Sequence, residues 1–525
     1  MSAAGPDDVG GEAAPPDEAG PAPSLDVMLE EIDRAVEPVS ESASFAPAAG
    51  IAVAGGAMLS LPHEEAAAPV VGRESFRSGF TQAGPVAVAG LIVNGASAVI
   101  VVIVAHLVTP RAYGAIAQLL GLFFILSMPG SAVLVGVVRR VTALRANGHP
   151  ERVHRWATKV HRVLLAAILV ELVVVWALQD WIARQLSLPN SQGVLLILVA
   201  AGVWILLCVD RGLLQAHRDY RALAINLLVE GGMRTVCVIG FVVAGMGVSG
   251  YALGIFLSEV VATVHARWLA ARAWPALPVV PAPDDPVAVA VSNHPSAGAE
   301  VARRVLVADV SAAFVGLALL GLLQNVDVIL LGRLNHAQAG AYAAISVASK
   351  ALVFGALALG AYLLPEATIR WNEGGHALRQ LMVTLAFLAV PAVVLLGIAL
   401  FIPVRFLSLI FTPKLATAAP AFASLVGAMI FLCISVLLTN YLFGAGRRWI
   451  VLLLAAGSVL AVGLVFAADG KPLATARADL LVQALLALAM GTAFVLVHYR
   501  HHGEQWRQRR QLAGTGRRLR RPSPG

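Results

Sequence analysis

Several ionisable side chains lie inside long apolar stretches of this sequence, where they could bind a charged group or pair with one another. Glu230 and Arg234 are four residues apart in one run, so they share a helix face and could neutralise each other. Lys350 lies deep in another run, with no acidic residue nearby in the sequence. An ionisable group at the centre of a membrane helix costs about 2.5–3.5 kcal/mol to insert, so it tends to face a cavity or a partner. The positions of Arg234 and Lys350 therefore indicate one of two arrangements. Either they line an interior cavity that binds an anionic headgroup, or they form buried ion pairs that stabilise the structure.

Other polar residues in the apolar runs extend this candidate site. We place Asn94 with Lys350, Arg234 and Glu230 in a substrate-binding set. A second set, for coupling or gating, is formed by Asp327, Glu171 and Glu259. Packing between helices is the alternative role for these carboxylates.

No motif for catalysis or metal binding accompanies these residues. The sequence contains no Gly-x-x-x-x-Gly-Lys-Ser/Thr, His-Glu-x-x-His or Gly-x-Ser-x-Gly pattern. Cys208, Cys237 and Cys433 are far apart and show neither metal-ligand spacing nor a disulfide framework. We therefore expect no catalytic residue, no metal site and no cofactor, and do not expect an enzyme.

One short segment occurs twice, each time between two apolar runs. Ala112-Tyr113-Gly114-Ala115-Ile116 has its counterpart in Ala341-Tyr342-Ala343-Ala344-Ile345. We expect each copy to form a hinge, with Pro110, Tyr113 and Gly114 in the first and Gly340 and Tyr342 in the second. Internal repeats are common in membrane transporters, so the alternative of chance similarity is disfavoured.

The composition is that of a membrane protein. Hydrophobic residues make up 58% of the 525 residues and charged residues only 13%, whereas soluble domains carry about 25% charged residues. A membrane-crossing helix needs about 20 apolar residues. The sequence predicts an all-α polytopic protein with about 12 transmembrane helices in two six-helix lobes around a central cavity, at residues 84–108, 113–138, 160–178, 193–213, 222–245, 248–270, 305–331, 339–364, 377–401, 417–442, 449–468 and 476–499.

Composition also divides the chain into five parts. Residues 1–78 form an acidic tail, expected to be disordered, and residues 501–525 form a basic tail. The lobes are expected at 79–270 and 303–500, with a Pro-rich linker at 271–302. The basic tail should bind anionic lipid headgroups at about 1 kcal/mol per charge, rather than nucleic acid.

Lys and Arg concentrate in every second loop, which predicts the orientation. The loop after the second predicted span carries seven of them, whereas the alternate loops carry few. Because basic loops stay in the cytoplasm, both termini are predicted to be cytoplasmic.

Three places in the sequence resemble the polysaccharide-biosynthesis flippases of the multidrug/oligosaccharidyl-lipid/polysaccharide (MOP) exporter superfamily. His106-Leu107-Val108-Thr109-Pro110-Arg111-Ala112-Tyr113-Gly114 is similar to the family's hinge after the first span. The other two are the stretch from Arg211 through Glu230 to Arg234, and that from Asp327 to Gly340 and Tyr342. The resemblance covers roughly residues 79–500.

The resemblance implies alternating access that moves an undecaprenyl-pyrophosphate-linked glycan across a bacterial cytoplasmic membrane. It also implies a possible H⁺ or Na⁺ coupling ion, and a polysaccharide polymerase or regulatory protein as a possible partner for the tails. Two alternatives stay open. A multidrug antiporter of the same superfamily would use carboxylates to meet cationic substrates, and a non-transporting scaffold would assemble a polymer-synthesis complex.

Overall fold

The computed structural model describes residues 73–146, 150–188, 191–273, 297–372 and 378–519. Every element over these residues is a helix. The expected acidic tail lies almost entirely outside the described residues, and the Pro-rich linker lies outside them except for its first three and last six residues. The sequence-based fold class is confirmed: the chain is an all-α membrane protein with two lobes.

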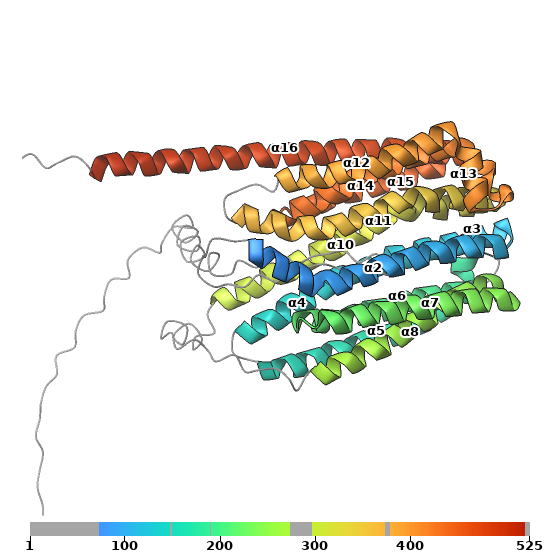
Figure 1. Cartoon of the computed structure of the whole chain (residues 1–525), viewed down its shortest axis with the longest axis horizontal. Helices are drawn as coiled ribbons and strands as arrows, with labels where there is room; N and C mark the ends of the chain where they lie inside the picture. The colour runs from blue at the N-terminus through green and yellow to red at the C-terminus, as the bar shows by residue number, and fades with distance from the viewer. Residues whose placement is uncertain (1–72, 147–149, 189–190, 274–296, 373–377, 520–525) are drawn as a thin grey trace, which may run out of the picture. The chain divides into compact units, whose positions relative to one another are not determined.

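The first lobe comprises α2 to α8, coloured blue to green in Figure 1. Its elements are α2 (Arg73–Leu107), α3 (Pro110–Ser127), α4 (Gly130–Ala146), α5 (Pro150–Gln185), α6 (Gln192–Ala216), α7 (Tyr220–Phe241), a short π-helical turn (Val242–Met246) and α8 (Gly247–Ala273). The central helix is α6, which packs against α3, α4, α5 and α8.

The second lobe comprises α10 to α16, coloured yellow to red in Figure 1. Its elements are α10 (Ala297–Leu334), α11 (His336–Asn372), α12 (Leu378–Phe401), α13 (Pro403–Ile410), a 3-10 segment (Pro413–Ala421), α14 (Phe422–Gly444), α15 (Ile450–Ala467) and α16 (Pro472–Leu519). The central helix is α14, which packs against α11, α12 and α16.

Eleven stretches of the described residues are long and apolar enough to cross a membrane. One of them, Tyr220–Arg272, has 53 residues, about 80 Å of helix, which is more than twice a hydrocarbon core of about 30 Å. It is broken at Gly245 and Gly247, whose positive φ angles (83° and 52°) suit glycine. Beyond this break α8 folds back on α7, with Gly254 against Val238. The stretch therefore crosses twice, which gives the twelve crossings expected from the sequence.

Thr109 and Pro110 shape the first hinge, between α2 and α3. The side chain of Thr109 accepts a hydrogen bond from the backbone N–H of Ala112 (3.3 Å) and caps α3. Pro110 occupies the first helical position, where its missing N–H is not needed. The chain therefore turns sharply from α2 into α3 at the repeated segment.

Helix α3 lies at the boundary between the lobes. It packs against α6 and α8 of its own lobe and against α10 and α11 of the second lobe. Its apolar side chains Ile116, Leu119 and Phe123 are buried. The hinge that begins α3 therefore lies where one lobe meets the other.

Candidate functional site

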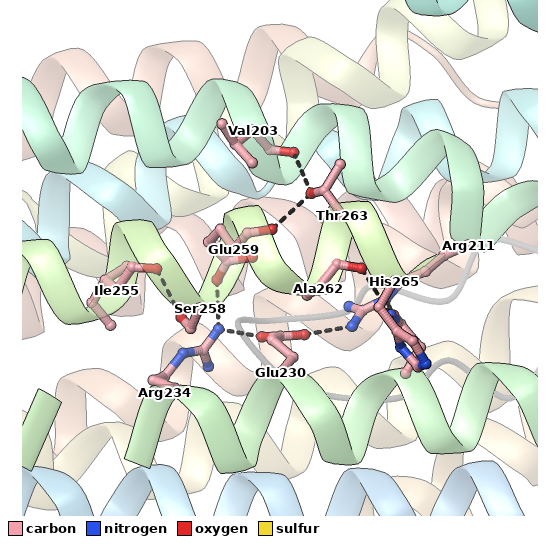
Figure 2. Close-up of polar contacts among 11 residues, drawn as sticks. Val203, Arg211, Glu230, Arg234, Ile255, Ser258, Glu259, Ala262, Thr263 and His265 are labelled. Atoms are coloured by element: carbon pink, nitrogen blue, oxygen red, sulfur yellow. Dashed lines mark hydrogen bonds and ion pairs between the residues drawn. The ribbon is translucent and has the colours of Figure 1, made fainter. Parts of the chain in front are cut away.

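Four charged side chains form an ion cluster inside the first lobe, which Figure 2 shows between α6, α7 and α8. The first-lobe ion cluster consists of Arg211, Glu230, Arg234 and Glu259, and each member is at most 4% exposed. Arg211 donates to Glu230 at 2.5 Å, and Arg234 donates to Glu259 at 2.6 Å. Arg234 also donates to Glu230 one helical turn before it, which is the pairing their spacing allows. The cluster thus ties α6 and α8 to α7.

Uncharged side chains also contact Arg211, the member of the cluster that lies on α6. The Nε of Arg211 donates to the side-chain oxygen of Asn226 (2.8 Å), and the amide of Asn226 donates to the carbonyl of Ala262 (2.9 Å). The guanidinium of Arg211 also lies over the ring of Trp204, 5.4 Å from its centroid, a cation–π contact. Arg211 is therefore fixed within the lobe by groups from α6, α7 and α8.

The cluster balances its own charge. Two guanidinium groups face two carboxylates, and Glu230 accepts from both arginines. A buried charge is retained only when it is paired and hydrogen-bonded. The carboxylates Glu230 and Glu259 are consequently already engaged by cations of their own lobe.

A second charged group lies in the same lobe and was not anticipated from the sequence. Nε2 of His161 on α5 is 3.0 Å from Oδ1 of Asp210 on α6, and Arg267 on α8 lies 3.6 Å from the same oxygen. Asp210 is fully buried. The available signal in the sequence was an acidic residue inside the apolar run 193–213.

The turn between α6 and α7 closes the end of the lobe that carries most of its basic residues. His217 contacts the carbonyl of Leu213 at 2.6 Å, and Arg145 donates to the carbonyl of Ala216 at 2.8 Å. Burial lowers the pKa of His217 below its usual value of 6.5, so it is neutral at pH 7. The positive charge at this end therefore comes from arginine and lysine.

A second cluster occupies the second lobe, between α10, α11 and α16. The second-lobe polar cluster consists of six residues that are at most 6% exposed: Asn325, Asp327, Tyr342, Lys350, Asp479 and Gln483. Nζ of Lys350 donates to Oδ1 of Asn325 at 3.2 Å and lies 3.8 Å from Oδ1 of Asp327. The hydroxyl of Tyr342 donates to Oδ2 of Asp327 at 3.0 Å. Lys350 thus has an acidic partner in space, although it has none nearby in the sequence.

The third helix of this cluster adds a second carboxylate. Gln483 donates to Oδ1 of Asp479 (3.1 Å) and to the carbonyl of Leu323 (3.1 Å), which joins α16 to α10. Asp479 is fully buried. The cluster therefore contains two buried carboxylates, Asp327 and Asp479, and one ammonium group, which lies 3.8 Å from Asp327. Asp479 was missed from the sequence, although it too is an acidic residue within an apolar run.

The two hinge segments meet across the boundary between the lobes. Gly114 approaches Ala339 so closely that a Cβ at position 114 would lie 2.7 Å from that of Ala339. A Cβ on Gly340 would overlap the carbonyl oxygen of Pro110. Tyr113 lies in the same contact and is 2% exposed. Close backbone approach, which only glycine permits, therefore holds the two repeats together.

Hydrogen bonds from neutral side chains accompany this contact. Gln118 on α3 donates to the carbonyl of Ile329 on α10 (3.2 Å) and to that of Leu186 (3.2 Å). Ser187 donates to the carbonyl of Arg333 at 3.3 Å. The described contacts at this boundary are thus close packing and hydrogen bonds from uncharged groups.

The sequence-based site residues are distributed over both lobes. Arg234, Glu230 and Glu259 come together in the first-lobe ion cluster, and Lys350 and Asp327 in the second-lobe polar cluster. Asn94 is half-buried on α2, and Glu171 is half-buried on α5 beside Gly202. That Lys350 and Arg234 share one headgroup site stays a prediction, because each is engaged with carboxylates of its own lobe.

Solved structures share this fold. They include an inward-facing multidrug resistance MATE family transporter of the MOP superfamily (TM-score 0.57, 13% identity, 77% of this chain and 95% of that chain). A MATE in complex with MaD3S aligns with a TM-score of 0.54 (14% identity, 80% and 96% of the chains). A MOP superfamily transporter from Pyrococcus furiosus, with a binding pocket of reverse polarity that suggests a different function, aligns with a TM-score of 0.51 (14% identity, 77% and 92%).

These likenesses define the fold as that of the MATE transporters of the MOP superfamily. No protein-family model matches the chain, and no curated protein matches it significantly. The structures thus confirm the fold that the sequence resemblance implied, and leave the superfamily and the flippase subfamily to be argued separately.

Proposed function

We propose that this protein is a secondary-active membrane transporter that works by alternating access between its two lobes. The proposal rests on a difference between the contacts within each lobe and the contacts between the lobes. The ion pairs of the two buried clusters each lie within one lobe, and the lobes meet through the two copies of a repeated hinge. A duplicated bundle with this arrangement is suited to rocking of one repeat against the other.

The energetics of the two kinds of contact favour this motion. Disrupting a buried ion pair costs about 3–5 kcal/mol, so the clusters oppose deformation within a lobe. The contact of Gly114 and Gly340 with the opposite lobe is made by small residues, and the hydrogen bonds of Gln118 and Ser187 are neutral. Such a boundary separates at lower cost than the interior of either lobe.

We further propose that the substrate is a lipid-linked oligosaccharide or polysaccharide precursor. The sequence resemblance to the polysaccharide flippases supports this choice. A small, mainly apolar pocket lies between first-lobe residues of α2, α3 and α8 and Val347 of the second lobe. A cationic drug would require an available carboxylate; Glu230 and Glu259 are bound to arginines, which leaves Glu171 as the first-lobe carboxylate for that role. The multidrug antiporter is therefore the second candidate.

Other parts of the proposal rest on the sequence. The substrate carrier would be undecaprenyl pyrophosphate in a bacterial cytoplasmic membrane, with both termini of the protein in the cytoplasm. For Lys350 and Arg234 to bind its diphosphate, each would exchange a carboxylate partner for a phosphate during transport. Asp327 would serve gating, Glu171 and Glu259 would serve coupling to H⁺ or Na⁺, and the tails would contact membrane lipids or a polymerase.

The deciding experiment compares two glycine variants in cells that depend on this protein. Gly340→Ala introduces a clash at the hinge, whereas Gly463→Ala adds the same methyl group where nothing lies within 4 Å. We expect lipid-linked glycan to accumulate in the inner leaflet with Gly340→Ala and not with Gly463→Ala, at equal protein levels. Loss of cationic dye efflux with normal glycan export would support the antiporter. Normal export and efflux in a strain without the protein would support the scaffold.

A further inference from the structure

The second-lobe polar cluster has the ligand set of a cation site, and a side chain fills the position of the cation. Oxygen atoms of carboxylates and amides are the ligands that hard cations prefer. In this cluster the amide oxygen of Asn325 lies 3.2 Å from Nζ of Lys350, and Oδ1 of Asp327 lies 3.8 Å from it. The ammonium group therefore occupies the place where a monovalent cation would neutralise these oxygens.

Two carboxylate oxygens in this cluster have no hydrogen-bond donor among the described residues. Oδ1 of Asp327 and Oδ2 of Asp479 are buried, and neither accepts a hydrogen bond within the described part of the chain. A buried carboxylate oxygen without a donor needs a nearby positive charge. Lys350 lies 3.8 Å from Oδ1 of Asp327, and Asp479 is the second buried carboxylate of the cluster. Removal of the Lys350 charge would leave the cluster with two buried carboxylates and no ammonium group.

The ammonium group and the two carboxylates come from three different helices. Lys350 reaches the cluster from α11, whereas Asp327 is on α10 and Asp479 on α16. Three helices thus supply the charged groups of the cluster, and its positive charge is covalently attached to the protein. While a tethered cation of this kind occupies the site, it neutralises the site and prevents a free cation from entering it.

We propose that Lys350 is a built-in counter-cation that makes the second lobe independent of metal ions, and that removing its charge converts the cluster into a Na⁺ site. That Lys350 fills a cation site does not depend on the proposed transport function. Only the effect of Lys350 on ion coupling rests on that function. In coupling, Lys350 would exclude Na⁺ from this lobe.

The test measures thermal unfolding of the purified full-length protein in NaCl and in choline chloride at equal ionic strength. Wild type and Lys350→Arg are expected to unfold at the same temperature in both salts. Lys350→Met is expected to be stabilised by NaCl over choline chloride by at least about 2 °C. Adding Asp479→Asn to Lys350→Met should abolish that difference. Lys414→Met, at an exposed lysine, is the matched control and should behave as wild type.

Each result decides the proposal. A Na⁺-dependent shift in wild type that Asp327→Asn removes would overturn it, as would the absence of a shift in Lys350→Met. Should Lys350→Met fail to fold, the double variant with Asp479→Asn should fold better, because it removes one charge of each sign; equal failure of both would overturn the proposal. Since unfolding is measured without transport, these results do not depend on glycan export, and a failed export assay would leave them unchanged.

Discussion

Gly340 of α11 lies directly against the backbone carbonyl of Pro110 at the start of α3, in the opposite lobe. A Cβ at position 340 would overlap that oxygen. The two residues belong to the two copies of the repeated segment. The duplication thus reappears in the structure as a contact of one copy with the other.

The first prediction concerns this contact. Gly340→Ala should disfavour the closed boundary by about 1–3 kcal/mol, because the added methyl group overpacks a site with no room. We expect a cysteine placed at Ala117, which lines the pocket between the lobes, to react with a maleimide several-fold faster in this variant. The background should carry Cys237→Ser, since Cys208 and Cys433 are buried. An unchanged rate, or an equal rise with Gly463→Ala, would show that the hinge does not hold the lobes together.

The second prediction concerns the first-lobe ion cluster. Glu230→Gln leaves two buried guanidinium groups with one carboxylate, Glu259, and should lower the free energy of unfolding by about 3–5 kcal/mol. Thermal unfolding in detergent measures the effect. The control is Glu151→Gln, at an exposed glutamate paired with Arg152 at 3.8 Å, where a change below about 1 kcal/mol is expected. Equal effects of the two substitutions would contradict the role of the cluster.

The third prediction tests charge balance in the same cluster. Arg234→Met alone leaves Glu259 without its donor, whereas Arg234→Met with Glu259→Gln removes one charge of each sign. We expect the double variant to be more stable than Arg234→Met, because an unpaired buried charge costs more than a missing pair. The measurement is a double-mutant cycle of unfolding temperatures. Additive losses would mean that the two side chains do not depend on each other.

The fourth prediction concerns orientation. Arg448 and Lys471 are exposed at opposite ends of α15. From the charge bias we expect Lys471→Cys to react with an impermeant thiol reagent added to intact cells, and Arg448→Cys to react only after permeabilisation. The reverse pattern would place both termini outside. Labelling of both positions from outside would mean that α15 does not cross the membrane.

The sequence alone predicted the ion pair that forms within a single helix. Glu230 and Arg234 lie one turn apart, and the structure joins them through a hydrogen bond. The twelve crossings and the two lobes were likewise predicted, because apolar length and repetition are local properties of the chain. The single stretch of 53 residues resolves into two helices at Gly245 and Gly247, as the two predicted spans require.

Which helices supply the partners was decided only by the tertiary structure. Arg211 reaches Glu230 from α6, and Gln483 of α16 donates to the carbonyl of Leu323 on α10, more than a hundred residues earlier in the chain. The helical period places a side chain on a face but does not determine which helix packs against that face. In an apolar bundle many packings bury the same surface. The sequence therefore determined which charges would need partners, and the packing of distant helices determined the partners they have.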